Sequence, residues 1–153
     1  MIQTSIDWPT SGHFCFEFRM GIEGEAASAA ARYRTSDDLI ALADVVRRLE
    51  RLEPNQDGLE EDYAFHLGVA RASHNDFYVS AIYAIRDNIF GGMLLARTTS
   101  GLRTKEKIAA INAQHRKVYE AIVAGDPDRA RNAMRGHLSA CRKSTSHWDA
   151  PVY

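Results

Sequence analysis

Apolar residues recur along the chain at steps of three and four positions, which is the spacing of amphipathic α-helices. Two stripes keep this spacing: Leu39, Leu42, Val46 and Leu49, and Ile108, Ile111, Val118 and Ile122, the second with His115 at its centre. No segment shows the alternation of a half-buried strand or the turn of a hairpin. The pattern predicts an all-α fold, an antiparallel bundle of about six helices joined by short connections.

Capping residues and helix breakers set the expected element boundaries. Thr35 or Ser36 starts a helix that Pro54 stops, and Gly125 with Pro127 separates the last two helices. Between these points the pattern predicts helices from Phe16, over 59–73, over 77–96 and from Lys105. Pro9 to Gly12 has the composition of a loop. We therefore expect a linker or tail over residues 1–15, one domain over 16–143, and a C-terminal tail over 144–153.

The first and fourth helices carry further packing expectations. On the first, Phe18 and Ile22 continue into alanines, and so many small residues favour close approach by a neighbouring helix. Arg19 and Glu23 stand four residues apart, which is typical of a surface ion pair. On the fourth, Phe77 is a candidate for burial.

Composition limits the function classes. The chain has 153 residues, 45% of them hydrophobic, with a formal net charge of -1, which does not favour direct binding to a phosphate backbone. No apolar run approaches the ~20 residues of a membrane span, and no signal peptide is visible. Cys15 and Cys141 lie far apart and are expected as free thiols. We expect a cytoplasmic protein that does not associate with membranes.

Four polar residues stand where a bundle helix normally has apolar ones. Asp62 and His66 are one helical turn apart in the middle of the third predicted helix. His115 interrupts an aliphatic stripe, and His137 occupies an inward position of the last helix. An unpartnered carboxylate in a core costs several kcal/mol, so these groups require partners. We infer that the four side chains converge and bind a divalent metal.

The donor set leaves the metal and its geometry open. Imidazole and carboxylate ligands suit Zn²⁺, Ni²⁺, Mn²⁺ or Fe²⁺. Four ligands on an octahedral ion leave positions for water or a small anion, whereas on tetrahedral Zn²⁺ they close the site. For Asp62 and His66 alone, a hydrogen bond within one helix is an equal alternative. His13, His74 and His147 fall in predicted loops or tails and are expected at the surface.

Several motifs occur in the order found in one known family. They are Phe16-Glu17-Phe18-Arg19 running into Ile22-Glu23-Gly24-Glu25-Ala26-Ala27, then Asp62-x-x-x-His66 with Ala72-Ser73-His74-Asn75, then Gln114-His115-x-x-Val118-Tyr119-Glu120-Ala121-Ile122, and finally Ala130-x-x-Ala133-Met134-x-x-His137-Leu138. The chain resembles the FCD domain, the C-terminal effector-binding domain of FadR-type GntR transcriptional regulators. The resemblance covers residues 16–143.

This resemblance implies a metal held inside the bundle by the residues matching Asp62, His66, His115 and His137. It also implies a small organic acid bound beside or on the metal. Arg19 matches the position of an arginine that donates two parallel hydrogen bonds to the carboxylate of that acid. Arg86 is a second candidate for binding the effector. Asn88, a polar group in the same apolar span, is a third.

Regulators of this type are homodimers that read DNA through an N-terminal winged helix-turn-helix. The residues before Phe16 are too few for one, so we expect either an isolated sensing domain or a protein without its DNA-binding half. The sequence favours an effector-sensing and dimerisation module. A metal-dependent enzyme that activates water is the first alternative, but no residue is identified as its general base. A bundle that metal merely stabilises is the second.

Overall fold

The computed structural model describes residues 8–99 and 103–144, and every regular element in those ranges is a helix. This confirms the all-α prediction, with seven helices in the described residues where about six were expected. The helices are α1 Trp8–Tyr33, α2 Ser36–Glu50, α3 Leu59–Ala72, α4 Asp76–Ala84, α5 Arg86–Thr99, α6 Lys105–Ala124 and α7 Pro127–Ser144. None of these helices is long and apolar enough to cross a bilayer.

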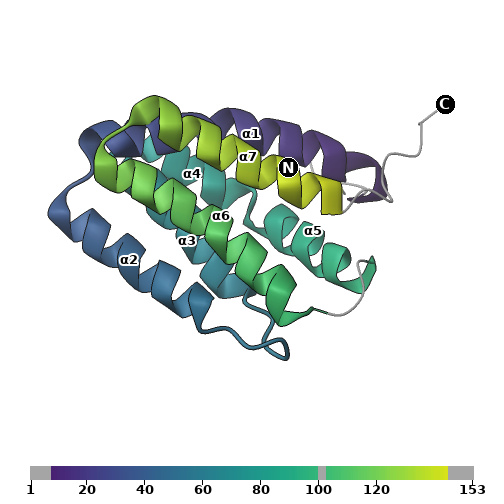
Figure 1. Ribbon diagram of the computed structural model, residues 1–153. Helices are drawn as coiled ribbons and strands as arrows, with labels where there is room; N and C mark the ends of the chain where they lie inside the picture. Colours follow the sequence, from purple (N-terminus) through teal and green to yellow (C-terminus); the bar gives the residue numbers. More distant parts are fainter. Residues whose placement is uncertain (1–7, 100–102, 145–153) are drawn as a thin grey trace.

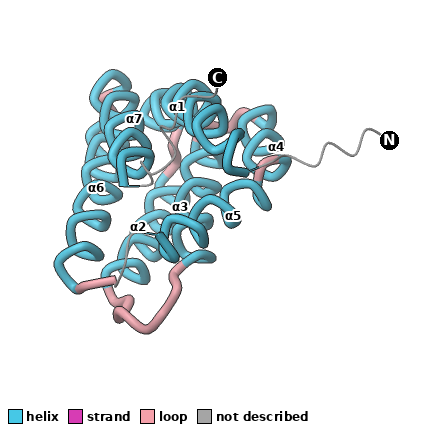
Figure 2. Tube along the Cα trace, turned by 90° about the vertical axis from the view of Figure 1, so that its right-hand side faces the viewer, coloured by secondary structure: helices cyan, strands magenta, loops and turns pink. Residues whose placement is uncertain are grey.

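The long helices α1 and α7 lie side by side and run antiparallel (Figure 1). Arg131 of α7 donates to Glu25 at 2.7 Å, while Arg135, one turn further on, reaches back to the carbonyl of Met20. Gly24 lies under the Arg135 side chain, because a Cβ there would stand 2.8 Å from Nε of Arg135. Helices α2, α3 and α5 lie below this pair in the view turned by 90° (Figure 2).

Two apolar clusters form the core. The larger one joins α1, α2, α3, α6 and α7, and its α1 members are small, as the sequence suggested. The smaller one joins α3, α4 and α5. The fully buried alanines of α1 are Ala27 and Ala30, with Ala31 nearly so. Since α3 contributes to both clusters, its polar residues Asp62 and His66 stand in the interior.

The predicted caps at two helix ends are present. Thr35 caps α2 through a reciprocal pair of hydrogen bonds with Asp38, the capping box. Gly125 ends α6 at φ 67°, in the left-handed region that glycine adopts without strain. Thr35 therefore fixes where α2 begins, and Gly125 fixes where α6 ends. These two positions in turn help to set which face of each helix meets the core.

The expected loop at Pro9 to Gly12 was wrong, because α1 already begins at Trp8. A proline in the first turn is compatible with a helix, since the amide hydrogen it lacks has no partner there. His13 consequently lies on α1 and not in a loop, and its side chain lies outside the described residues, as does all of His147. The proposed domain limits at residues 16 and 143 stay predictions.

The single helix expected over 77–96 is two helices, α4 and α5, separated at Ile85. No proline or glycine stands at this break, so the sequence carries no local signal for it. The break allows Ile82 of α4 and Ile89 of α5 to be buried together against α3.

Phe77, which was expected to be buried, and Phe18, which is part of the apolar pattern of the first helix, are both exposed. Phe77 is 87% exposed, since it stands in the first turn of α4 where that helix begins away from the core. Phe18 is 49% exposed because the inward face of α1 is occupied instead by Arg19 and Glu23.

Candidate metal centre

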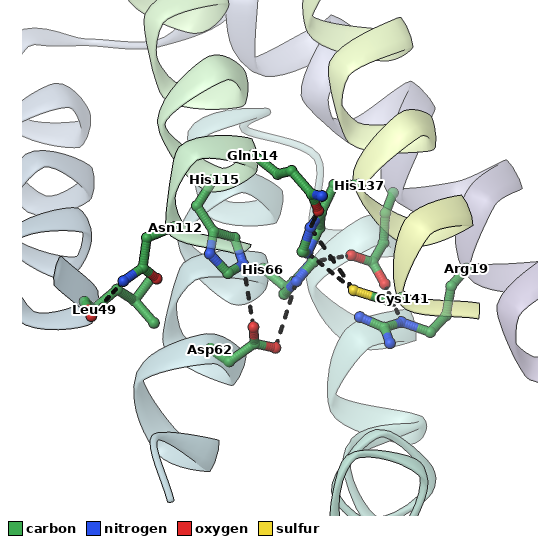
Figure 3. A network of polar contacts seen from close by, with 10 residues as sticks. Arg19, Leu49, Asp62, His66, Asn112, Gln114, His115, His137 and Cys141 are labelled. Atoms are coloured by element: carbon green, nitrogen blue, oxygen red, sulfur yellow. Dashed lines mark hydrogen bonds and ion pairs between the residues drawn. The ribbon is translucent and has the colours of Figure 1, made fainter. Parts of the chain in front are cut away.

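Three helices bring four polar side chains to one point inside the bundle (Figure 3). Asp62 and His66 come from successive turns of α3, His115 from α6 and His137 from α7. One ligand atom from each residue lies within 4.8 Å of all the others. The three histidines are buried, and Asp62 is partly buried. The convergence inferred from the spacing along the chain is therefore present in the structure.

The Asp62 carboxylate stands between two of the imidazoles. Its Oδ1 atom is 3.1 Å from Nε2 of His115, and its Oδ2 atom is 3.6 Å from Nε2 of His66. The ring centroids of His115 and His137 are 4.3 Å apart, and Phe65 covers His115 at 4.7 Å. The site is thus walled by aromatic rings and shielded from water on that side.

Several nitrogens at this point lack a hydrogen bond. Nε2 of His66 and both ring nitrogens of His115 are buried without a hydrogen-bond partner. Buried polar atoms are nearly always satisfied in folded proteins, so unsatisfied imidazole nitrogens facing a carboxylate call for a further group. A divalent cation fits, because three imidazoles and one carboxylate are the donors that Zn²⁺, Ni²⁺, Mn²⁺ and Fe²⁺ accept.

Two residues outside the cluster fix the orientation of two of its three imidazoles. Nδ1 of His66 donates a hydrogen bond to Oε2 of Glu23, whose other oxygen accepts from Nε of Arg19 at 2.6 Å. Nδ1 of His137 lies 2.9 Å from Oε1 of Gln114. With Nδ1 protonated, each ring presents the lone pair of Nε2 for coordination. This is the usual arrangement of metal-binding histidines supported by an outer acceptor.

The protonation states suit metal binding. Burial by itself would raise the pKa of Glu23, but the Arg19 guanidinium and the His66 ring bring it down to about 2. Burial would likewise raise the pKa of Asp62, yet His115 and His66 beside it hold that pKa well below its usual range. Burial, together with His115 and His66, lowers the pKa of His137 well below its usual value. Ionised carboxylates and a neutral imidazole are the forms that coordinate metals.

A cavity of about 530 Å³ opens beside the cluster, and all four candidate ligands line it. Of the residues predicted to bind an effector, Arg19 and Asn88 also line this cavity, and Arg19 is only 5% exposed. The cavity lining does not include Arg86. Its guanidinium donates to Glu60 of α3 at 2.9 Å and stacks over the ring of Phe90.

Sequence reasoning missed Glu23 and Gln114 as members of this site. Glu23 was interpreted as half of a surface ion pair with Arg19, whereas both residues are buried and the pair faces the cluster. A signal was present, because Glu23 is one turn from Arg19 on the face that continues into the buried alanines. His74 is at the surface as expected, where it pairs with Asp38 at 2.7 Å.

Comparison with known protein families gives a match over most of the chain. The family model described as the FCD domain matches residues 15–140. The chain belongs to the FCD domain family. Both the fold class and the order of motifs noted in the sequence agree with this assignment.

Similar proteins are transcriptional regulators. This FCD chain is 25% identical over 142 residues to the Glc operon transcriptional activator of Escherichia coli K12, covering 89% of this chain and 56% of that protein. It is 29% identical over 124 residues to the HTH-type transcriptional regulator LutR of Bacillus subtilis, covering 80% and 57%. A solved structure, Streptococcus agalactiae GntR, superposes with a TM-score of 0.68 at 25% identity, covering 93% of this chain and 62% of that one.

The FCD chain therefore spans a little more than half the length of these curated relatives. Their names are those of regulators of transcription and not of enzymes.

Proposed function

We propose that this chain is the effector-sensing and dimerisation domain of a cytoplasmic GntR-type transcriptional regulator. It binds one divalent metal through Asp62, His66, His115 and His137, and a small organic acid beside that metal. The acid biases the arrangement of two subunits and thereby the DNA-binding heads carried elsewhere in the regulator. The names and the greater lengths of the regulators to which it is similar support this role.

The observation that carries the proposal is the meeting of four ligand atoms within 4.8 Å next to a cavity that Arg19 also lines. Nε of Arg19 is engaged by Glu23, so the guanidinium keeps its place whether or not a ligand is bound. Its remaining N–H donors are suited to a carboxylate that also approaches the metal. A metal serving only to stabilise the bundle would not require a cavity with a buried arginine beside it.

Asn88 is the second proposed effector contact. It lines the cavity from α5, and no hydrogen-bond partner is found for its amide among the residues that the structure describes. The amide can therefore meet a polar substituent of the acid. We leave Arg86 out of the effector site, because its contacts with Glu60 and Phe90 direct it away from the cavity.

Metal analysis combined with thermal unfolding tests the proposal. The purified protein is expected to contain about one divalent ion per chain by elemental analysis. A panel of mono- and dicarboxylic acids is then expected to raise the melting temperature of the metal-loaded protein, and not that of chelator-treated protein. If no acid in the panel shifts the melting temperature of the loaded protein, the sensing role is wrong.

A pair of arginine substitutions tests the carboxylate contact. Arg19→Lys keeps the charge beside Glu23 but removes the forked donor, so the affinity for the stabilising acid should fall by about tenfold or more. Arg86→Lys, the matched change at an arginine outside the cavity, should leave that affinity within about twofold. Equal effects of the two changes would contradict the assignment of Arg19.

A further inference from the structure

The cavity beside the metal cluster has walls that are mostly aliphatic. They come from the end of α2 and from the consecutive helices α5 and α6. The principal apolar residues of these walls are Leu49, Leu52, Ile89, Met93, Ile108 and Ile111. Ile111 is 40% exposed even though it continues a helical core stripe, because its side chain borders this cavity and not packed protein.

Most polar side chains in the lining are already committed to the protein itself. Asn112 donates to the carbonyl of Leu49 at 2.8 Å, and Gln114 is bound to His137. Arg103 donates to the carbonyls of Gln56 and Asp57 in the connection between α2 and α3. Arg19 and the metal ligands are therefore the charged groups available beside the proposed metal, while Asn88, Arg103 and Lys107 also line the cavity, and the remaining lining is mostly apolar.

The cavity's size agrees with this division. Its volume of about 530 Å³ lies within the ~300–1,000 Å³ of pockets that enclose drug-sized ligands. An acid with only two or three carbon atoms would occupy the polar end and leave the aliphatic walls in contact with water. A ligand that removes those walls from water gains affinity with every methylene that it buries.

We propose that the effector is an amphipathic monocarboxylic acid with an apolar body of about six to ten carbon atoms. Its carboxylate lies at the metal and Arg19, and its apolar body lies along Leu49, Ile89 and Ile111. This inference rests on the proposed function, since it specifies the acid that the same site accepts. The inference goes beyond the proposed function because it excludes short hydroxy acids and dicarboxylic acids as the preferred ligands.

Calorimetric titration of the metal-loaded protein with acetate, butanoate, hexanoate and octanoate tests the inference. Each buried methylene should tighten binding about fourfold, so octanoate, which has about six more methylenes than acetate, should bind more than about 1,000-fold tighter. Glycolate should bind no tighter than hexanoate. If affinity does not rise with chain length while acetate or glycolate binds, the inference is wrong and the proposed function stands. If no acid binds at any length, the proposed function fails as well.

Two further titrations distinguish this site from general adsorption of a fatty acid. Removal of the metal should weaken octanoate binding by about tenfold or more, because the carboxylate loses its principal partner. Equal binding to the metal-free protein would overturn the inference.

Octanedioate should bind more weakly than octanoate, since its second carboxylate would be placed among aliphatic side chains. If octanedioate bound more tightly than octanoate, a second anion-binding group would lie in the cavity away from the metal. That result would also overturn the inference.

A matched pair of substitutions locates the apolar body. Ile111→Asn adds a polar group to the wall, whereas Ile40→Asn makes the same change at a position of α2 that is 66% exposed and outside the cavity. Ile111→Asn should weaken octanoate binding by about tenfold with acetate unchanged, and Ile40→Asn should change neither. Retained acetate binding also shows that the variant is folded. If Ile111→Asn leaves octanoate binding unchanged, the apolar body does not lie on this wall.

Discussion

Glu23 accepts a hydrogen bond from Nδ1 of His66, and so a residue of α1 determines which nitrogen His66 offers to the interior of the bundle. The carboxylate is itself held by Arg19, four residues earlier on the same helix. Nε2 of His66 consequently faces Asp62, without a hydrogen bond of its own. This relationship connects the helix that packs against α7 with the proposed metal.

Replacing Glu23 by Gln should weaken metal binding. Glutamine can still accept a hydrogen bond, but it loses the charge that increases the basicity of the His66 ring. Loss of such outer partners typically lowers metal affinity 10–100-fold, and we expect an effect in that range by competition with a coloured chelator.

The matched control for this change is Glu25→Gln, two residues further along α1. Glu25 is ion-paired with Arg131 and Arg135 at the surface and does not contact the cluster. Its substitution should leave metal affinity within about twofold. If both variants lost metal affinity to the same extent, α1 would affect metal binding only through the overall stability of the fold. Glu23 would then have no role in positioning His66.

Removal of Phe65 should destabilise the metal-free protein strongly. Phe65 is fully buried between the main core and the ring of His115. Phe65→Ala should lower the free energy of unfolding by about 3–5 kcal/mol in a denaturant titration. Phe77→Ala, at a residue that is 87% exposed, should change it by no more than about 0.5 kcal/mol. Similar losses in the two variants would contradict the burial described here.

The capping box of α2 should make a small contribution to stability that acid removes. Burial would raise the pKa of Asp38, but hydrogen bonds from Thr35 and the nearby His74 lower it below its ordinary value of 3.8. A carboxyl group whose pKa is lowered by folding stabilises the folded state above its unfolded pKa. That stability is lost as the pH falls through the folded pKa.

Chelator-treated protein keeps the loss of bound metal at low pH from adding to this effect, and the metal ligands titrate alike in the two proteins compared. Between pH 6 and 3, wild type should lose up to about 1 kcal/mol more unfolding free energy than Asp38→Asn, which carries no titrating group at this position. Parallel stability curves for the two proteins over this range would show that the Asp38 charge does not stabilise α2.

The sequence predicted most of the fold because its signals were local. The aliphatic stripes, the cap at Thr35 and the break at Gly125 each depend on a few neighbouring residues, and α2, α3, α6 and α7 lie where those signals put them. The break at Ile85 has no such signal. It arises from packing of α4 and α5 on α3, which is a tertiary effect.

The candidate site was predictable for a related reason. Asp62, His66, His115 and His137 each interrupt an apolar stripe, and a polar residue in a core position is conspicuous in a sequence. Glu23 and Gln114 do not interrupt a stripe. Glu23 has an ordinary i, i+4 partner in Arg19, and the meeting of Gln114 with His137 depends on how α6 packs against α7. The contact of Gln114 therefore becomes apparent only once the helices are placed in space, whereas the sequence carried one signal for Glu23, its position on the face that continues into the buried alanines.

Metal titration of chelator-treated protein tests the central claim most directly. Wild type should bind about one equivalent of a divalent ion such as Ni²⁺ or Zn²⁺, and His115→Ala should lose more than about 100-fold in affinity, while the surface variant His74→Ala binds like wild type. Absence of stoichiometric binding by wild type, or undiminished affinity in His115→Ala, would contradict the account.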